Sequence, residues 1–234
     1  MALERISNIL NDVSNILLPR LCFGCNARLY RGEVILCTSC RHQLPLTEHT
    51  FNEENSVDRI FYGRINIKKA ASFLFLTERG IVKNLIHYLK YRNQEKIGAF
   101  LGDWFGQLLM QDGDLAHIDY VIPVPLHKRK LQQRGYNQVA LFAQRLAYHI
   151  DATYRDDILV KTANTRTQTK KNRLGRWYDN RSLYELRNPE ELIHKNILLV
   201  DDVITTGATM EICAQNFIAI EGATIYVVSM AVVP

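Results

Sequence analysis

Long apolar runs are missing from this sequence, which bears on where the protein works. A helix needs about 20 consecutive apolar residues to span a bilayer, and no stretch of the chain approaches that length. Residues 1–20 are amphipathic, and they lack the unbroken apolar core and the small-residue cleavage site of a signal peptide. We therefore expect a cytoplasmic protein without a membrane span.

Internal repeats and low-complexity tracts are also missing, and the charge is only mildly unbalanced. Hydrophobic residues make up 47% of the 234 positions and charged residues 23%, which is typical of a globular protein and argues against a disordered tail. The formal net charge of +5 permits contact with an anionic partner but does not require nucleic acid.

Cysteine is scarce, and its few positions are clustered. Four of the five cysteines form two CxxC pairs: Cys22, Cys25, Cys37 and Cys40. An odd number of cysteines without a signal peptide argues against a secreted disulfide framework. Two such pairs suit the site of four thiolates that Zn²⁺ prefers, so we predict a structural zinc site. Two disulfides or four unrelated buried cysteines are the alternatives, and Cys213 is expected to be a core residue.

Apolar runs alternate with amphipathic stretches through most of the chain. Apolar runs predict strands at 70–76, 120–124, 197–200 and 223–233. Apolar residues at helical spacing predict helices at 3–17, 80–91, 98–110, 137–150 and 208–221. This alternation predicts an α/β fold in which helices cover both faces of a mostly parallel sheet.

Residues 47–58 are polar, acidic and poor in periodic apolar positions, which is typical of a linker. We therefore predict two units: an N-terminal helix with the zinc module at 1–46, and an α/β domain at 59–234. The small N-terminal unit offers little apolar core, which is a second reason to expect a stabilising metal.

The strongest chemical signal is the segment ILLVDDVITTGAT at 197–209. A buried strand runs into two acidic residues, then a Thr/Gly loop, then a helix. The loop is thereby placed at the carboxyl end of a strand, where ligands of parallel sheets bind. Backbone amides at the start of a helix suit a phosphate group. The predicted phosphate-binding residues are Thr205, Thr206, Gly207, Ala208 and Thr209.

The acidic pair, Asp201 and Asp202, offers acceptors matched to the vicinal hydroxyls of a ribose and can help to hold Mg²⁺. The segment is not a Walker A loop, because the Gly-Lys-Ser/Thr ending is missing. Taken singly, two aspartates can be a solvated strand end, and Thr-Thr-Gly can be a plain turn. Their order behind an apolar strand favours a phosphate site.

Two basic segments accompany this site. The first, at 123–138, lies between a strand and a helix, and we predict that it cradles a pyrophosphate. Its candidate residues are Pro125, Leu126, His127, Lys128, Arg129 and Arg134. The second, at 164–180, is long and aperiodic, which is typical of a functional lid. Its candidate residues are Arg166, Gln168, Lys170, Arg173 and Arg176.

Together these segments make the chain similar to the ComF family, bacterial proteins linked to natural competence and DNA uptake. The resemblance is carried by CFGC and CTSC at 22–40, PVPLHKRKLQQRGYNQ at 123–138, TRTQTKKNRLGRWYDN at 165–180 and ILLVDDVITTGAT at 197–209. LKY at 89–91 is a weaker match. Tyr136 and Lys171 depart from the family pattern, in which phenylalanine and an apolar residue are usual at these positions.

The resemblance implies a type I phosphoribosyltransferase fold preceded by a small zinc-finger module. It implies that the chain binds 5-phosphoribosyl-1-pyrophosphate (PRPP) with Mg²⁺ and displaces pyrophosphate at the anomeric carbon, with a nucleobase or an amine as acceptor. Asp201 and Asp202 would hold the ribose hydroxyls, and residues 205–209 the 5-phosphate. The turn at 125–128 would meet the pyrophosphate, and the segment at 165–180 would close as a flexible loop.

Two other functions fit the same residues. A non-catalytic DNA-uptake factor would bind single-stranded DNA or competence proteins through the basic segments, with Trp177 and Tyr178 as stacking groups and PRPP as a regulator. A PRPP sensor would bind the ligand without turnover. Solvated surface charge and a loop without a role are the plainer interpretation of the two basic segments.

Overall fold

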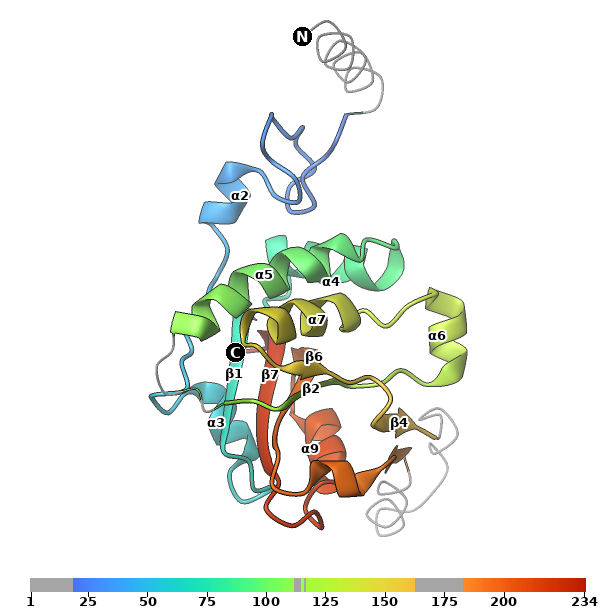
Figure 1. Cartoon of the computed structure of the whole chain (residues 1–234). Coiled ribbons are helices and arrows are strands. Elements are labelled where there is room, and N and C mark those ends of the chain that lie inside the picture. The colour runs from blue at the N-terminus through green and yellow to red at the C-terminus, as the bar shows by residue number, and fades with distance from the viewer. Residues whose placement is uncertain (1–18, 112–114, 116, 163–182) are drawn as a thin grey trace, which may run out of the picture.

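The computed structural model describes residues 19–111, 115, 117–162 and 183–234 (Figure 1). The predicted helix at 3–17 and the predicted lid lie outside the described residues. The candidate residues of the lid therefore also lie outside them: Arg166, Gln168, Lys170, Arg173 and Arg176. None of the helices that are described is both long enough and apolar enough to cross a membrane.

A parallel sheet forms the centre of the described fold, as the alternating apolar runs predict. Its strands are β1 (Lys69–Phe75), β2 (Tyr120–Pro123), β3 (Thr153–Tyr154), β6 (Asn196–Ile204) and β7 (Thr224–Val232). They lie in the order β1-β7-β6-β2-β3, and each neighbouring pair is parallel. The strand order reverses between β2 and β6. Ligands of open parallel sheets bind at the carboxyl ends of strands beside such a reversal.

Helices cover both faces of the sheet (Figure 1). One face carries α4 (Ile81–Tyr91), α5 (Lys96–Gln111) and α7 (Ala140–His149), and the other carries α3 (Ser56–Phe61) and α9 (Ala208–Gln215). Successive side chains of β6 alternate between the two cores: Leu198 joins the first, and Ile197 and Leu199 join the second. Both faces of the strand are apolar because both are covered.

Shorter elements complete the described chain. They are α2 (Thr38–His42), α6 (Lys128–Arg134), a 3₁₀ helix at Pro189–Leu192, and an antiparallel hairpin of β4 (Leu159–Lys161) and β5 (Tyr184–Leu186). The hairpin strands flank the segment that contains the predicted lid.

Close packing of α5 on α7 depends on a glycine. A Cβ at Gly102 would lie 2.7 Å from the carbonyl oxygen of Phe142 and 2.8 Å from the Cβ of Arg145. A contact this short with backbone cannot be relieved by a side-chain rotation. Gly102 therefore sets the distance between α5 and α7, two helices of the same face of the sheet.

Two predicted boundaries differ from the structure by four residues or more. β6 continues four residues past the predicted end at Val200, because its backbone stays paired with β7, with Asp201 opposite Ser229. The acidic pair therefore lies within the strand rather than after it. α9 ends at Gln215 instead of residue 221, because the next amides bond at shorter range, as from Phe217 to the carbonyl of Ala214 at 3.0 Å.

The cysteine module packs on α4 and α5 through apolar side chains. Leu29, Ile35 and Leu36 belong to the same core as these helices. The stretch at 47–58 lies along β1, where the amide of Thr47 donates to the carbonyl of Phe73 at 3.1 Å. This stretch runs into α3 and is ordered against the sheet, while the division of the chain into two units stays a prediction.

Candidate functional site

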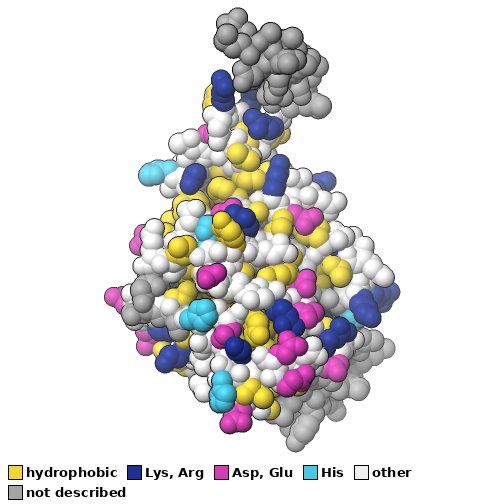
Figure 2. Space-filling view, viewed as in Figure 1, with side chains coloured by type: hydrophobic (Ala, Val, Ile, Leu, Met, Phe, Trp, Pro, Cys, Tyr) yellow, Lys and Arg dark blue, Asp and Glu magenta, His cyan; other side chains and the backbone are white. Residues whose placement is uncertain are grey.

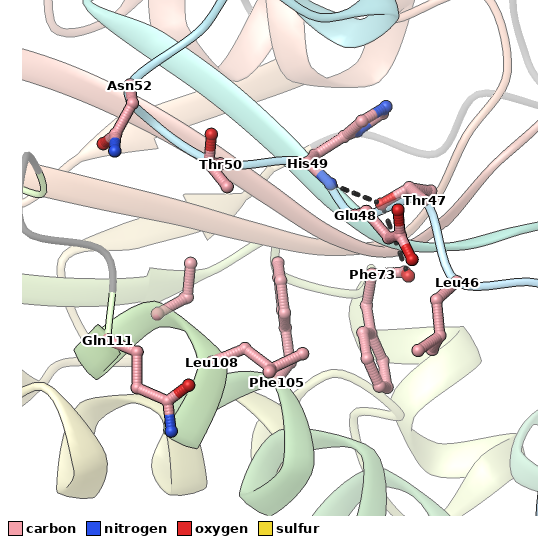
Figure 3. Close-up of a pocket in the computed structure, with 11 residues that line it drawn as sticks. Leu46, Thr47, Glu48, His49, Thr50, Asn52, Phe73, Phe105, Leu108 and Gln111 are labelled. Atoms are coloured by element: carbon pink, nitrogen blue, oxygen red, sulfur yellow. Dashed lines mark hydrogen bonds between the residues drawn. The ribbon is translucent and has the colours of Figure 1, made fainter.

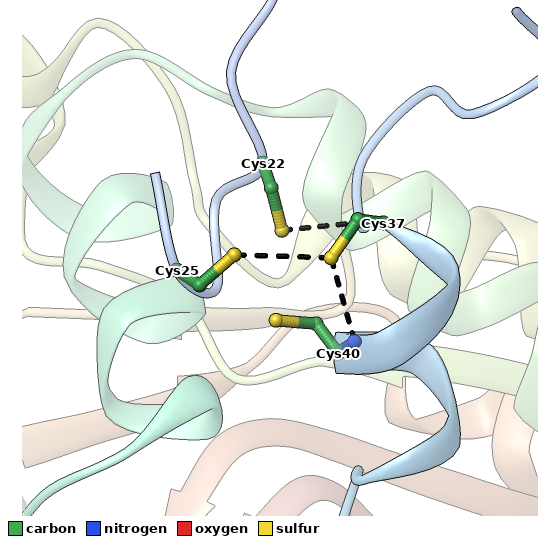
Figure 4. Close-up of side chains that lie close together, drawn as sticks. All are labelled: Cys22, Cys25, Cys37 and Cys40. Carbon is green, nitrogen blue, oxygen red and sulfur yellow. Dashed lines mark hydrogen bonds between the residues drawn. The ribbon is translucent and has the colours of Figure 1, made fainter. Parts of the chain in front are cut away.

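The four predicted zinc ligands converge on one point (Figure 4). Their Sγ atoms all lie within 4.8 Å of one another, and those of Cys25 and Cys37 are 3.8 Å apart. Tetrahedral Zn–S bonds of about 2.3 Å would separate the sulfur atoms by about 3.8 Å. All four cysteines are free in the structure, so the alternative with two disulfides is not formed. Cys22 and Cys40 are buried, and Cys25 is exposed.

Backbone amides favour the thiolate form of Cys22, whereas burial and the neighbouring thiols raise the pKa of Cys40. The Cys22 sulfur accepts hydrogen bonds from the amides of Gly24 at 3.4 Å and Cys37 at 3.3 Å. Burial acts to raise the pKa of Cys22, but these amides outweigh it and lower the pKa to about 7. A thiolate is the form that binds zinc. The residues present thus fit a closed site of four thiolates, which is structural rather than catalytic.

The predicted phosphate loop forms a small polar cleft of about 50 Å³ at the end of β6. Its lining includes Asp201, Thr205, Thr206, Gly207, Ala208 and Thr209. Gly207 turns the chain with φ of 74°, in the left-handed region, directly before α9 begins. A Cβ there would lie 2.6 Å from Ile60 Cγ2 and 2.9 Å from Phe61 Cε1. Glycine is therefore required at this position both by conformation and by the close approach of α3.

Arg64, which the sequence patterns do not single out, hydrogen-bonds to this loop. Arg64 donates from Nη1 to the carbonyl oxygen of Thr206 at 2.6 Å. Its Nε donates to Glu211 Oε2, in the first turn of α9, at 3.0 Å. The guanidinium thus ties the loop to the helix that follows it. No local signal marks this contact, because Arg64 and Glu211 lie 147 residues apart in the chain.

The acidic pair is buried among polar partners from other elements. Lys90 Nζ, from the end of α4, lies 2.9 Å from Asp202 Oδ1. Gln138 donates from Nε2 to the other oxygen, Oδ2, at 2.5 Å. The amide of Asp202 donates to Asp201 Oδ1 at 2.8 Å. Asp202 is only 5% exposed, and its carboxylate is held in one orientation by groups from two segments, α4 and the 123–138 segment.

Burial also sets the protonation of Asp201. Burial in the first place, and the charge of Asp202 in the second, raise the pKa of Asp201 well above its ordinary range. Lys161 of the β4–β5 hairpin is nearby, and burial lowers its pKa. Its Nζ donates to the hydroxyl of Tyr184, across the hairpin, at 2.8 Å. Lys161 and Tyr184 are therefore further polar residues at this edge of the sheet.

The predicted pyrophosphate residues are divided between two places. Pro125, Leu126 and His127 form the turn after β2, whose end lies beside β6. Lys128, Arg129 and Arg134 belong to α6, a helix without a buried residue that projects from the body of the fold (Figure 1). Lys128 and Arg129 are exposed on it.

Arg134 is the residue of α6 that contacts a partner of the acidic pair. Its guanidinium hydrogen-bonds to Gln138 Oε1, and Gln138 in turn holds Asp202. The same guanidinium lies over the ring of Tyr91, 5.7 Å from the centroid. The structure therefore connects Arg134 to the acidic pair through one residue and leaves the other basic residues of α6 at the surface.

A larger hollow lies away from these residues. It has a volume of about 380 Å³ and opens between the stretch at 46–52, β1 and the end of α5 (Figure 3). Phe73, Phe105 and Leu108 provide much of its wall, which is more apolar than polar. A cavity of this kind does not suit a phosphorylated sugar, so the cleft after β6 is the better candidate site.

Comparisons with known proteins agree with this architecture. A family model described as a phosphoribosyl transferase domain matches residues 139–233. The chain is 29% identical over 150 residues to DNA utilization protein YhgH of Salmonella typhi, and this match covers 61% of the chain and 63% of that relative. It is 26% identical over 199 residues to competence protein F of Haemophilus influenzae, covering 81% of the chain and 86% of the relative.

A third relative, competence protein ComFC of Bacillus subtilis, is 25% identical over 197 residues, which cover 84% of the chain and 77% of the relative. Among solved structures, an allosteric regulatory enzyme of purine biosynthesis aligns with 62% of this chain and 30% of its own, at a TM-score of 0.43 and 17% identity. The relatives and the domain match confirm the predicted resemblance to the ComF family, with a type I phosphoribosyltransferase domain behind a four-cysteine cluster.

Proposed function

We propose that this ComF-family chain binds PRPP with Mg²⁺ and acts as a phosphoribosyltransferase on a nucleobase or an amine. The cleft after β6 carries the proposal, because the loop at 205–209 and Asp201 line one small polar hollow beside the strand-order reversal. The phosphoribosyl transferase domain match supports it.

In this proposal the loop binds the 5-phosphate. The amides at the start of α9 and the hydroxyls of Thr205, Thr206 and Thr209 are donors, and the helix dipole favours an anion there. Asp201 and Asp202 would accept hydrogen bonds from the ribose hydroxyls. The carboxylates also suit Mg²⁺, which prefers oxygen ligands and would supply charge neutralisation to the leaving pyrophosphate when bound.

The proposed reaction breaks the bond between the anomeric carbon and the pyrophosphate oxygen and forms a bond to the acceptor nitrogen, which loses a proton. Charge develops on the sugar ring and on the leaving group. The tasks left to the chain are to orient the sugar, to stabilise the leaving anion and to limit water access. Buried, fixed side chains such as Asp202 suit the first of these tasks.

Calorimetry of PRPP with Mg²⁺ tests binding, with Asp201→Asn and Asp202→Asn as variants and Glu190→Gln, an exposed acid elsewhere, as the control. We expect binding by the unmutated chain and the control, and a loss of at least tenfold in the two site variants, as for charge-assisted hydrogen bonds. Equal PRPP binding by all four proteins would contradict the proposal. Release of pyrophosphate with a panel of nucleobases and amines then separates an enzyme from a sensor.

A second candidate function is binding of single-stranded DNA, which the names of the relatives suggest. Its structural support is the exposed basic helix α6, with Lys128, Arg129 and Lys130, where Figure 2 shows Lys and Arg side chains gathered at the edge of the molecule. Phosphate contacts of this kind weaken steeply with salt. Oligonucleotide binding at several salt concentrations tests it, and no binding at low salt would remove the idea.

A further inference from the structure

We propose that Lys90 is a ligand-binding residue of the same site, which pairs with Asp202 in the free chain and transfers to the pyrophosphate of PRPP when the ribose binds. This inference rests on the proposed PRPP function. It concerns a residue on α4, outside the segments predicted to hold PRPP.

The carboxylate of Asp202 is already engaged on both oxygens. Lys90 lies 2.9 Å from Oδ1, and Gln138 lies 2.5 Å from Oδ2. Asp202 is 5% exposed, so the remaining lone pairs of its oxygens face little open space. A ribose hydroxyl therefore needs one of the two partners to move before it can donate to this carboxylate.

Lys90 is the partner that can move. Gln138 is 6% exposed, and its own amide oxygen accepts a hydrogen bond from Arg134. The Lys90 side chain is 23% exposed and has the flexible stem of a lysine. The displaced ammonium would lose its counter-ion, which is costly in a partly buried place unless a second anion takes over.

The helix that carries Lys90 is fixed, so the change is confined to its side chain. Asn84 donates to the carbonyl of Gly24 at 2.7 Å, and Tyr88 donates from its hydroxyl to Asn26 Oδ1 at 3.1 Å. At the end of α4 the carbonyl of Leu89 accepts a hydrogen bond from Tyr136. These contacts join α4 to the cysteine module on one side and to the 123–138 segment on the other.

Pyrophosphate is the anion of PRPP that this position suits. Lys90 is followed by Tyr91, over which Arg134 lies, and Arg134 belongs to the segment predicted to cradle the pyrophosphate. The 5-phosphate loop, in contrast, is braced on the α3 side, by Arg64. An ammonium released from Asp202 therefore has the leaving group of PRPP as its new partner.

The test is calorimetry of PRPP, pyrophosphate and ribose 5-phosphate, each with Mg²⁺, on four proteins: the unmutated chain, Lys90→Met, Lys90→Arg and Lys83→Met. Lys83 is an exposed lysine on the same helix and serves as the matched control. We expect Lys90→Met to weaken PRPP and pyrophosphate by about tenfold to a hundredfold, as for a lost charge-assisted contact. Lys90→Arg should restore most of the affinity, and ribose 5-phosphate should change by less than about threefold.

Each result decides the matter. No PRPP binding by the unmutated chain removes the proposed function and this inference with it. PRPP binding by the unmutated chain, with equal or tighter binding by Lys90→Met, leaves the function standing and overturns the role of Lys90, because the ion pair would then be only structural or inhibitory. If Lys90→Met does not fold, Lys90→Gln is measured in its place against the same expectations.

Discussion

Two clusters of ionisable side chains lie beside α4, the cysteines near its start and the acidic pair at its end, and the groups around them differ. At one, four cysteine sulfurs converge within 4.8 Å, and the hydrogen bonds to Cys22 come from backbone amides. At the other, Asp202 is paired with Lys90 and bonded to Gln138. The sulfur atoms of the first cluster could bind a metal ion, whereas the second cluster already contains a cation, the Lys90 ammonium.

The difference fits the proposed roles, a structural site at the cysteines and a binding site at the acidic pair. Four thiolates without a metal would repel one another, so we expect the module that holds them to depend on zinc for folding. The acidic pair has a cation in place within the fold, so the sheet edge can form before any ligand binds. A binding residue that is paired in advance costs less to keep buried, and its partner is free to pass to the ligand.

The largest expected effect is removal of metal from the cysteine cluster. Chelation should unfold residues 19–46 and leave the sheet folded, because structural zinc contributes about 10 kcal/mol or more to such modules. Hydrogen exchange before and after chelation measures both regions in one experiment. Unchanged protection at 19–46 in a protein shown to be free of metal would contradict the zinc assignment.

Gly207→Ala tests how far the phosphate loop beside the acidic pair depends on packing. The new Cβ meets Ile60 and Phe61 at a φ of 74°, so we expect a loss of about 2–4 kcal/mol of unfolding free energy and of PRPP binding. Gly135→Ala is the matched control, because Gly135 has a φ of 84° but open space around it. It should cost only about 1 kcal/mol, and an equal loss in both variants would argue against the close approach of α3.

Asp201→Asn should stabilise the fold while it abolishes PRPP binding. The raised pKa of Asp201 means that the folded state keeps this proton longer than the unfolded chain does. The contribution of Asp201 to the unfolding free energy is therefore most favourable below the unfolded pKa of about 4, and it falls as pH rises toward the folded pKa.

Urea denaturation from pH 4 to 9 measures this effect. The variant should lose most of that pH dependence and gain about 1–2 kcal/mol at neutral pH, as is common when a strained functional group is removed. A variant that is less stable than the unmutated chain at pH 8 would mean that Asp201 is stabilising as a charge.

The smallest effect is expected on α6. Lys128→Ala combined with Arg129→Ala removes two exposed cations from a helix that buries no residue, so the unfolding free energy should change by less than about 0.5 kcal/mol. Oligonucleotide affinity at low salt should fall, while PRPP affinity stays within about threefold if Arg134 is the residue of α6 that reaches the site. A large loss of PRPP binding would place these cations in the site instead.

Strands and the phosphate loop are predictable here because their signals are local. β6 and β7 are apolar on both faces, and the order of Asp201, Asp202 and the Thr/Gly loop is contiguous in the chain. The helix α6 is missed because its Lys, Arg and Gln residues favour a helix without forming an apolar face.

Contacts between distant segments are not predictable in the same way. Arg64 and Glu211 lie 147 residues apart, and the sequence around Arg64 has no motif to mark it. Lys90 falls in the weakest of the family motifs, and only the fold shows that its ammonium reaches Asp202. Lys161 and Tyr184 meet because β4 and β5 pair as antiparallel strands, with these two residues opposite each other. Such partners depend on how helices and strands pack, which residue patterns along one chain do not encode directly.

The most direct test of the proposed PRPP site is a crystal structure of the full chain grown with PRPP and Mg²⁺. We predict the 5-phosphate on the amides of residues 205–209, the ribose hydroxyls on Asp201 and Asp202, and the Lys90 ammonium on the pyrophosphate. PRPP bound elsewhere, with the Asp202–Lys90 pair intact and the cleft after β6 empty, would contradict it.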